Sequence, residues 1–307
     1  MMPAITVNNI SKKYKTKKDS VQALSNISFD VEKGELFGII GPDGAGKTTL
    51  FRILTTLLLA DEGSASVDGL DVVKDFKAIR KTVGYMPGRF SLYQDLSVEE
   101  NLNFFATIFN TTIKDNYDLI KDIYSQIEPF KKRRAGALSG GMKQKLALSC
   151  ALIHRPSVLF LDEPTTGVDA VSRKEFWDML KNLKQQGITI LVSTPYMDEA
   201  AMCDRVALIQ LGKILSINTP QKIVEEFGKP LYSVKSDKML YVLKALQQFE
   251  GTEDVYPFGD VHHLILKNSY TSTSIEKYLH DKNLTATITE TMPNIEDCFI
   301  SLMKNND

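Results

Sequence analysis

The chain has 307 residues, 43% of them hydrophobic and 24% charged, which is typical of a folded globular protein and argues against a disordered, collagen-like or coiled-coil chain. This length accommodates one large α/β domain and a smaller second one. The 37 Lys and Arg residues are balanced by 38 Asp and Glu residues, so the net charge of -1 gives no general electrostatic basis for binding nucleic acid.

Neither an export signal nor a membrane span is visible in the sequence. The N-terminal segment MMPAITVNNI lacks a basic region followed by a long apolar stretch. No apolar run approaches the roughly 20 residues that a membrane-spanning helix needs. The three cysteines have no C-x-x-C spacing, so we expect reduced, buried thiols. These features predict a cytoplasmic protein.

The N-terminal 40 residues predict a small antiparallel sheet. Apolar and polar side chains alternate there, as at Ile5 and Val7 and again at Ile27 and Phe29, and this period of two is typical of half-buried strands. The segment Glu32-Lys33-Gly34 is expected to form a turn before the next strand.

A buried strand, Leu36–Ile40, is followed by a glycine-rich loop and a predicted helix, Lys47–Leu59. The loop and the helix start read GPDGAGKT, which fits the phosphate-binding pattern G-x-x-x-x-G-K-[ST] in its required strand–loop–helix context. Backbone N–H groups of such a loop surround a phosphate chain, the lysine reaches the outer phosphates, and the threonine can bind Mg²⁺. The predicted ATP-binding residues are Gly41, Pro42, Asp43, Gly44, Ala45, Gly46, Lys47, Thr48 and Thr49.

A largely helical insert is predicted from about residue 88 to residue 155. Apolar residues recur at helical spacing from Ser97 to Phe109, and helical sequence continues to about Phe130. Further along, LSGGMKQ at 138–144 is a second glycine-bearing loop that opens a helix. Ser139, Gly140 and Gly141 can therefore present a hydroxyl and N–H groups to a phosphate.

Alternating strands and helices then predict a parallel α/β sheet. The expected strands are 158–161, 189–192 and 206–209, with a helix at 172–185 and a hairpin turn at Leu211-Gly212-Lys213.

Two adjacent carboxylates, Asp162 and Glu163, end the first of these strands. Ligands of open α/β sheets bind at the carboxyl ends of the strands, so Asp162 is expected to join Thr48 at Mg²⁺. Glu163 is expected to polarise the water that attacks the γ-phosphate, which makes it the candidate catalytic residue. Considered alone, the segment would be interpreted as a strand followed by a solvated acidic turn, but its occurrence together with the phosphate loop favours the functional interpretation.

The remaining residues, 230–307, predict a second, α+β domain after the nucleotide-binding domain of residues 1–229. The expected order of elements is strand 231–235, helix 239–249, strands near Val255 and Leu264, helix 275–280, strand 286–289 and helix 295–303. This order suggests a ferredoxin-like module. His262 and His263 have no companion ligands, so no metal site is expected there.

The phosphate loop, LSGGMKQ and Asp162-Glu163 together resemble the ABC ATPase family, with similarity over roughly residues 5–227. The resemblance implies a P-loop NTPase with an antiparallel subdomain and a helical insert. It also implies a head-to-tail homo- or heterodimer, in which Ser139, Gly140 and Gly141 serve the ATP held by the opposite subunit. The cofactors implied are ATP and Mg²⁺, and nucleic acid is not an implied partner.

Further positions are assigned by the same resemblance. Tyr14 matches the aromatic residue that stacks on adenine, with ordinary packing as the alternative. Asp169 matches a residue that contacts the partner domain, and its alternative is a helix N-cap. Phe90, Leu92 and Tyr93 begin the part that receives a helix of the membrane permease, with core packing as the alternative.

Two positions depart from the family pattern. Gly88 stands where the family usually has a glutamine that binds Mg²⁺ and water, and Pro195 stands where it usually has a histidine that contacts the γ-phosphate. Neither replacement supplies a polar side chain. We therefore expect ATP binding with slow hydrolysis, and we hypothesise that a fully equipped second ABC domain completes an unequal pair.

The segments GPDGAGKTTL, FSLYQDLSVEENL and PNIEDCFISL resemble subunits of bacterial drug exporters. The implied function is an ATP-hydrolysing subunit, peripheral on the inner face of the cell membrane, that energises an ABC exporter. The alternative is a regulatory module that binds ATP with little hydrolysis. A soluble ABC protein acting on ribosomes or DNA is not favoured, because it would normally carry two ABC domains or a long coiled coil.

Overall fold

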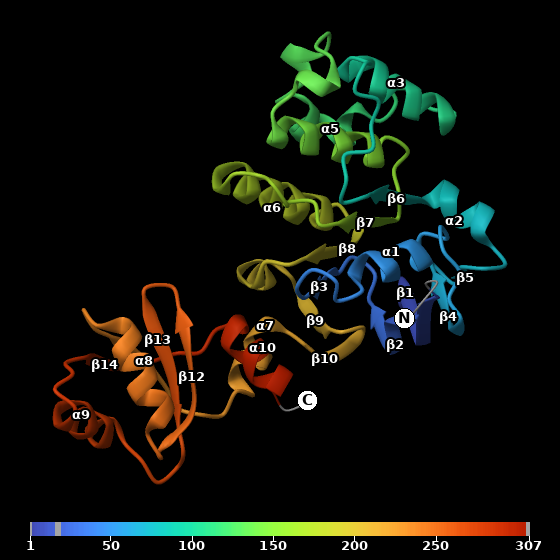
Figure 1. Ribbon diagram of the computed structural model, residues 1–307. Helices are drawn as coiled ribbons and strands as arrows, with labels where there is room; N and C mark the ends of the chain where they lie inside the picture. The colour runs from blue at the N-terminus through green and yellow to red at the C-terminus, as the bar shows by residue number, and fades with distance from the viewer. Residues whose placement is uncertain (1, 16–19, 305–307) are drawn as a thin grey trace. The chain divides into compact units, whose positions relative to one another are not determined.

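The structure is a computed structural model that describes residues 2–15 and 20–304 (Figure 1). Contacts divide the chain into two compact units, which are described separately. The first comprises Met1–Pro220 and Leu302–Asp307, and the second comprises Gln221–Ser301. The sequence predicted the boundary between residues 229 and 230, a few residues after the position at which the contacts place it, between Pro220 and Gln221.

The predicted N-terminal antiparallel sheet is present and contains two further strands that the sequence did not reveal. Ile5 pairs with Val31, and Val7 pairs with Phe29, so that the apolar side chains of both strands enter the same core. The strand order is β2-β1-β4-β5. Their bounds are β1 (Ile5–Lys15), β2 (Ser20–Val31), β4 (Glu62–Val67) and β5 (Leu70–Asp71).

A six-stranded sheet of order β10-β9-β3-β8-β7-β6 forms the centre of the first unit. All neighbours are parallel except β9 and β10, which are joined by the predicted hairpin at Leu211 and Gly212. Every residue of β3, β7 and β8 is buried, which explains why these strands read as continuous apolar runs. Their bounds are β3 (Leu36–Ile40), β6 (Val83–Met86), β7 (Val158–Asp162), β8 (Thr189–Thr194), β9 (Arg205–Gln210) and β10 (Lys213–Asn218).

Helix α1 (Lys47–Leu54) contacts both sheets and helps to form their common core. The predicted helix to Leu59 was too long. Thr56 has a φ of 64°, outside the helical region, and the N–H groups of both Leu57 and Leu58 bond the Arg52 carbonyl instead of continuing the helical pattern. The other helices of this region are α2 (Phe76–Thr82), α6 (Ala170–Gln185) and the 3-10 helix η3 (Met197–Met202).

The predicted helical insert is confirmed, but it consists of separate short helices. A capping box starts the first one, because Ser97 accepts from the Glu100 N–H and the Glu100 carboxylate accepts from the Ser97 N–H. Asn110, with a φ of 54°, interrupts the helical sequence that was expected to continue. In Figure 1 the insert lies beyond β6 and α6, both of which α5 contacts. Its elements are α3 (Val98–Ile108), α4 (Tyr117–Tyr124), η1 (Glu128–Phe130), η2 (Ala135–Ala137) and α5 (Gly140–Leu152).

The second unit has the ferredoxin-like order of elements predicted from the sequence. A β-α-β-β-α-β succession folds into an antiparallel sheet of order β12-β13-β11-β14, with α8 and α9 packed on one apolar face. His263 Nδ1 lies 2.6 Å from Asp297 Oδ1, and His262 Nε2 donates to the Met239 carbonyl. The bounds are α7 (Pro220–Glu225), β11 (Leu231–Lys235), α8 (Met239–Gln248), β12 (Thr252–Phe258), β13 (Val261–Leu266), α9 (Ser272–Asp281), β14 (Thr287–Thr291) and α10 (Ile295–Lys304).

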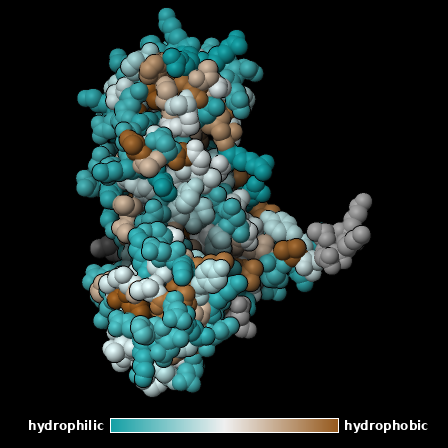
Figure 2. Space-filling model, turned by 60° about the vertical axis from the view of Figure 1, so that its left-hand side comes forward, coloured by the Kyte–Doolittle hydropathy of each residue, from teal (hydrophilic) through white to brown (hydrophobic). Residues whose placement is uncertain are grey.

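Polar residues predominate on the face shown in Figure 2, with small apolar groups scattered among them. Within residues 2–15 and 20–304, none of the helices combines the length and the hydropathy required to cross a bilayer. The three cysteines are free and buried, as predicted.

Candidate nucleotide site

The predicted phosphate loop connects β3 to α1, as its strand–loop–helix context requires. Gly46 has a φ of 106°, and a Cβ there would lie 2.4 Å from the Ala23 carbonyl oxygen, so the helix can start here only on a glycine. Lys47 is 3% exposed, and its ammonium donates to the carbonyl oxygens of Gly41 (2.7 Å) and Pro42 (3.0 Å). The loop therefore holds one buried positive charge at the N-terminus of α1.

The two predicted carboxylates meet this loop at the end of β7. Thr48 Oγ1 donates to Asp162 Oδ1 at 3.2 Å, and Lys47 Nζ lies 3.1 Å from Glu163 Oε1. Burial raises the pKa of Asp162, and the hydrogen bonds from Ser193 and Thr48 oppose that rise. Four side chains expected to act on a triphosphate are thus brought together from positions more than a hundred residues apart.

Ser193, at the end of β8, holds both carboxylate residues and was not recognised as a site residue. Its hydroxyl donates to Asp162 Oδ1 at 2.8 Å and accepts from the Glu163 N–H at 3.0 Å. Glu163 has a φ of 52°, a conformation that costs about 1–3 kcal/mol in a non-glycine residue and persists only where its surroundings impose it. The available signal was the position of Ser193 at the carboxyl end of a buried strand, next to the strand that carries Asp162.

Thr48 and Asp162 are suited to Mg²⁺. Magnesium prefers oxygen ligands and is generally held by one or two carboxylates together with substrate phosphates. The described residues contain no group of three or more His, Cys, Asp or Glu side chains that could hold a metal by themselves. A metal at this pair would therefore depend on phosphate oxygens for the rest of its coordination.

Tyr14 lies beside the phosphate loop, at the end of β1. The residue is 38% exposed, and its hydroxyl is 3.4 Å from Thr49 Oγ1 on α1. An exposed ring at this place is available for stacking, and the adenine contact stays a prediction.

The second glycine-bearing loop, Ser139, Gly140 and Gly141, begins α5, as predicted. It belongs to a different helix start from the phosphate loop, which begins α1. Ser139 caps the helix by accepting from the Met142 N–H, and an added Cβ on Gly141 would lie 2.7 Å from Ser172 Oγ. Within residues 2–15 and 20–304, no hydrogen bond or ion pair joins these three residues to Lys47 or Glu163. The two loops predicted to bind phosphate are thus not joined to each other by these residues within one chain.

Asp169 caps α6, which begins at Ala170, two residues before the predicted start. Its carboxylate accepts from the N–H groups of Val171 (3.1 Å) and Ser172 (3.0 Å), and the hydrogen bonds from Ser172 lower its pKa. The N-cap alternative is therefore present, and the contact with a partner domain stays a prediction.

The two atypical positions lie next to the carboxylates. A Cβ added to Gly88 would lie 2.9 Å from the Asp162 carbonyl oxygen and 3.7 Å from Glu163 Cβ. Pro195 directly follows Thr194, the last residue of β8. Both positions thus adjoin the strand ends that carry Asp162, Glu163 and Ser193.

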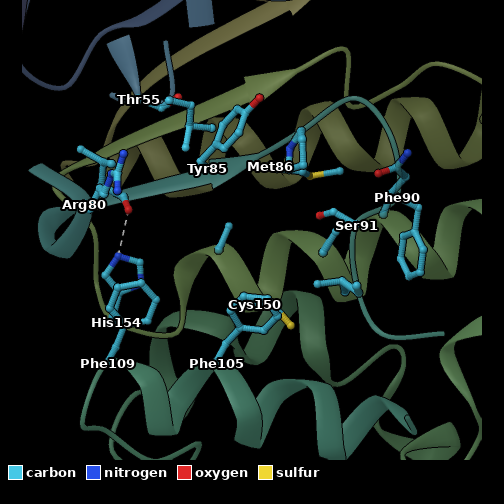
Figure 3. A pocket seen from close by; sticks show the side chains of 17 residues that line it. Thr55, Arg80, Tyr85, Met86, Phe90, Ser91, Phe105, Phe109, Cys150 and His154 are labelled. Atoms are coloured by element: carbon cyan, nitrogen blue, oxygen red, sulfur yellow. Dashed lines mark hydrogen bonds between the residues drawn. The ribbon is translucent and has the colours of Figure 1, made fainter. Parts of the chain in front are cut away.

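An apolar groove of about 210 Å³ separates the end of β6 from α3 and α5 (Figure 3). Phe90 and Leu92 line it, whereas Tyr93 is outside it and packs on Phe104 with ring centroids 4.9 Å apart. His154 stacks on Phe109 and donates through Nε2 to the Val83 carbonyl oxygen, the bond drawn in Figure 3. Burial lowers the pKa of His154.

Comparisons with known proteins agree with this geometry. A family model described as ABC transporter matches residues 24–166. The chain is 38% identical over 303 residues to the probable multidrug ABC transporter ATP-binding protein YbhF of Escherichia coli (strain K12), covering 97% of this chain and 52% of YbhF. It is 37% identical over 228 residues to the doxorubicin resistance ATP-binding protein DrrA of Mycobacterium tuberculosis (strain CDC 1551 / Oshkosh), covering 73% of this chain and 68% of DrrA.

Among solved structures, CbiO1 from Clostridium perfringens, part of the ABC transporter complex CbiONQ, superposes with a TM-score of 0.64 at 25% identity, covering 74% of this chain and 92% of CbiO1. The chain spans about half the length of YbhF and more than two thirds of DrrA. The shared sequence, the fold and the assembled loop and carboxylates lead to one assignment. The chain belongs to the family of ABC transporter ATP-binding proteins.

Proposed function

We propose that this chain binds and hydrolyses ATP as the motor subunit of an ABC membrane transporter. The observation that carries the proposal is the convergence of Lys47, Thr48, Asp162 and Glu163 at one end of the parallel sheet. Lys47 is buried at the start of α1, and its ammonium supplies a positive charge for the outer phosphates.

Glu163 is the group placed to orient and polarise the attacking water. Phosphoryl transfer needs a positioned nucleophile and stabilised charge rather than covalent catalysis, and a carboxylate 3.1 Å from Lys47 lies within reach of the γ-phosphate that this lysine would bind. Mg²⁺ held by Thr48 and Asp162 would supply charge neutralisation at the phosphates. Ser193 maintains the positions of both carboxylate residues.

A second ABC domain completes the site. Ser139, Gly140 and Gly141 are not joined to Lys47 within the described chain, although they form a loop that can hold phosphate at the start of α5. A head-to-tail pair would place this loop over the ATP bound to the other subunit. The partner domain is either identical or different.

The groove lined by Phe90 and Leu92 is the proposed seat for a cytoplasmic helix of a permease. It is apolar, and Pro87 and Phe90, which lie on either side of Gly88 in the chain, both line it, so that a helix bound there would act directly on the segment beside Asp162. The chain would then be peripheral on the inner face of the cell membrane. Since YbhF and DrrA are named for multidrug transport and doxorubicin resistance, the proposed direction is export.

Binding of radiolabelled ATP combined with light scattering tests this proposal. We expect the full chain to bind ATP, and we expect ATP to double the mass of the E163Q variant if two identical domains pair. Binding without a change of mass would favour a different partner domain. A chain that binds no ATP would refute the proposed function.

Slow turnover follows from Gly88 and Pro195, which provide no polar side chain near the carboxylates. Removal of one donor to a transition state commonly costs about 10²-fold in rate. Pairing with a second, fully equipped ABC domain would give the dimer one fast and one slow site.

Restoring glutamine with G88Q should not raise kcat, because the new Cβ would lie 2.9 Å from the Asp162 carbonyl and displace the backbone that leads into Glu163. The G88A variant adds the same Cβ without the amide and serves as the control. Steady-state phosphate release from both variants should be at or below the wild-type rate. A several-fold rise in kcat for G88Q alone would contradict this expectation.

A further inference from the structure

A buried carboxylate other than Asp162, that of Glu199 in η3, is hydrogen-bonded to the end of β8 and to the turn after β7. It is 3% exposed, and its Oε2 accepts hydrogen bonds from Thr165 Oγ1 (3.1 Å) and from Thr194 Oγ1. Burying a carboxylate costs folding free energy unless the group is hydrogen-bonded or paired. The buried position of Glu199 therefore calls for an explanation. No motif in the sequence singles out Glu199.

The two threonines belong to the two segments that determine the position of Glu163. Thr165 lies two residues after Glu163 in the turn closed by the bond from the Thr166 N–H to the Glu163 carbonyl. Thr194 directly follows Ser193, which accepts the Glu163 N–H through both its hydroxyl and its carbonyl oxygen. One oxygen of Glu199 thus joins the end of β8 to the turn after β7.

The other oxygen of Glu199 has no hydrogen-bond partner among the described residues. Its nearest cation is Arg173, whose Nε lies 3.9 Å away and whose guanidinium stacks on Tyr196 at 4.7 Å from the ring centroid. Arg173 is in the first turn of α6, next to Ser172, whose Oγ would lie 2.7 Å from a Cβ added to Gly141.

We propose that Glu199 is a positioning residue that fixes the Glu163 carboxylate for water attack by tying Thr165 to Thr194. This inference rests on the proposed function. Among the described residues, the hydrogen bonds and the ion pair of the Glu199 side chain go to Thr165, Thr194 and Arg173 and not to the phosphate loop, so we expect it to act through Glu163 rather than on ATP. Because Glu163 occupies a left-handed conformation that its surroundings must impose, loosening either threonine releases the carboxylate from its place.

The test is a comparison of E199A with E199Q in the full chain, using ATP binding and single-turnover hydrolysis of radiolabelled ATP. We expect E199A to lower the hydrolysis rate by about 10²-fold, the size of effect typical of a misplaced reacting group, while the Kd for ATP changes by less than about twofold. E199Q should restore most of the rate, because its amide oxygen can accept from both threonines. We therefore expect the hydrolysis rate to depend on the two hydrogen bonds that Glu199 accepts and not on its negative charge.

A matched pair of threonines separates positioning from general stability. Thr194 and Thr189 are both buried and lie at opposite ends of β8, where Thr189 Oγ1 accepts from the Gly34 N–H. T194V should lower the rate as E199A does, whereas T189V should lower Tm and leave the rate of the folded protein unchanged. Equal rate losses in both threonine variants, or an unchanged rate in E199A, would overturn the inference.

A double-mutant cycle distinguishes this inference from the proposed function. If Glu199 acts through Glu163, adding E199A to E163Q should cause no further loss of rate. An additive loss would overturn the positioning role and leave the ATPase proposal intact. Absence of ATP binding by the wild-type chain would instead refute the proposed function itself.

Discussion

Replacing Glu163 by glutamine should reduce ATP hydrolysis by about 10²–10⁴-fold, the usual effect of removing a general base. The same variant should bind ATP more tightly. Glu163 Oε1 lies 3.1 Å from Lys47 Nζ, so its negative charge competes with a phosphate for the lysine and repels the γ-phosphate. Phosphate release and equilibrium binding of a fluorescent ATP analogue measure the two effects.

Glu175 provides the control for this substitution. It is a surface carboxylate on α6 that pairs with Lys145 at 2.7 Å, and E175Q should leave both rate and affinity near the wild-type values. If E163Q retains the wild-type rate, Glu163 is not the catalytic group. If the wild-type chain hydrolyses no ATP and E163Q changes nothing, the regulatory alternative gains support.

Replacing Lys47 by alanine should weaken ATP binding by roughly 10- to 100-fold, since a charged hydrogen bond contributes about 1.5–3 kcal/mol. Lys47 is nearly fully buried and holds the only ammonium within hydrogen-bonding reach of the Gly41 and Pro42 carbonyls among the described residues. Its loss also leaves Glu163 without its cationic partner. Isothermal titration calorimetry with ATP measures the change.

The control for K47A is K184A, which removes a surface lysine paired with Asp204 at 2.6 Å. A surface ion pair contributes about 0–1 kcal/mol, so this variant should bind ATP with wild-type affinity. Full retention of ATP affinity in K47A would remove the basis of the proposed nucleotide site. Circular dichroism of both variants should confirm that the fold is unchanged.

Local patterns explain which elements could be predicted. The buried strand before Gly41, the loop itself and the ferredoxin-like succession after residue 230 each depend on near neighbours in the chain, through turn residues and apolar periodicity. Helix α1 was predicted too long, because the apolar run to Leu59 resembles a helix. The positive φ of Thr56 ends the helical geometry before that run is complete.

The residues of the candidate site likewise fall into those predicted from local sequence and those found only in the structure. Lys47, Thr48, Asp162 and Glu163 could be predicted as candidates from the sequence, because their motifs are local and their chemistry follows from residue type and spacing. Three contacts became visible in the folded chain alone: Ser193 holds both carboxylate residues, Gly88 faces the Asp162 carbonyl, and Glu199 joins Thr165 to Thr194. The physical reason is that these contacts arise from the parallel order β8-β7-β6, which sets strand ends side by side that are far apart along the chain.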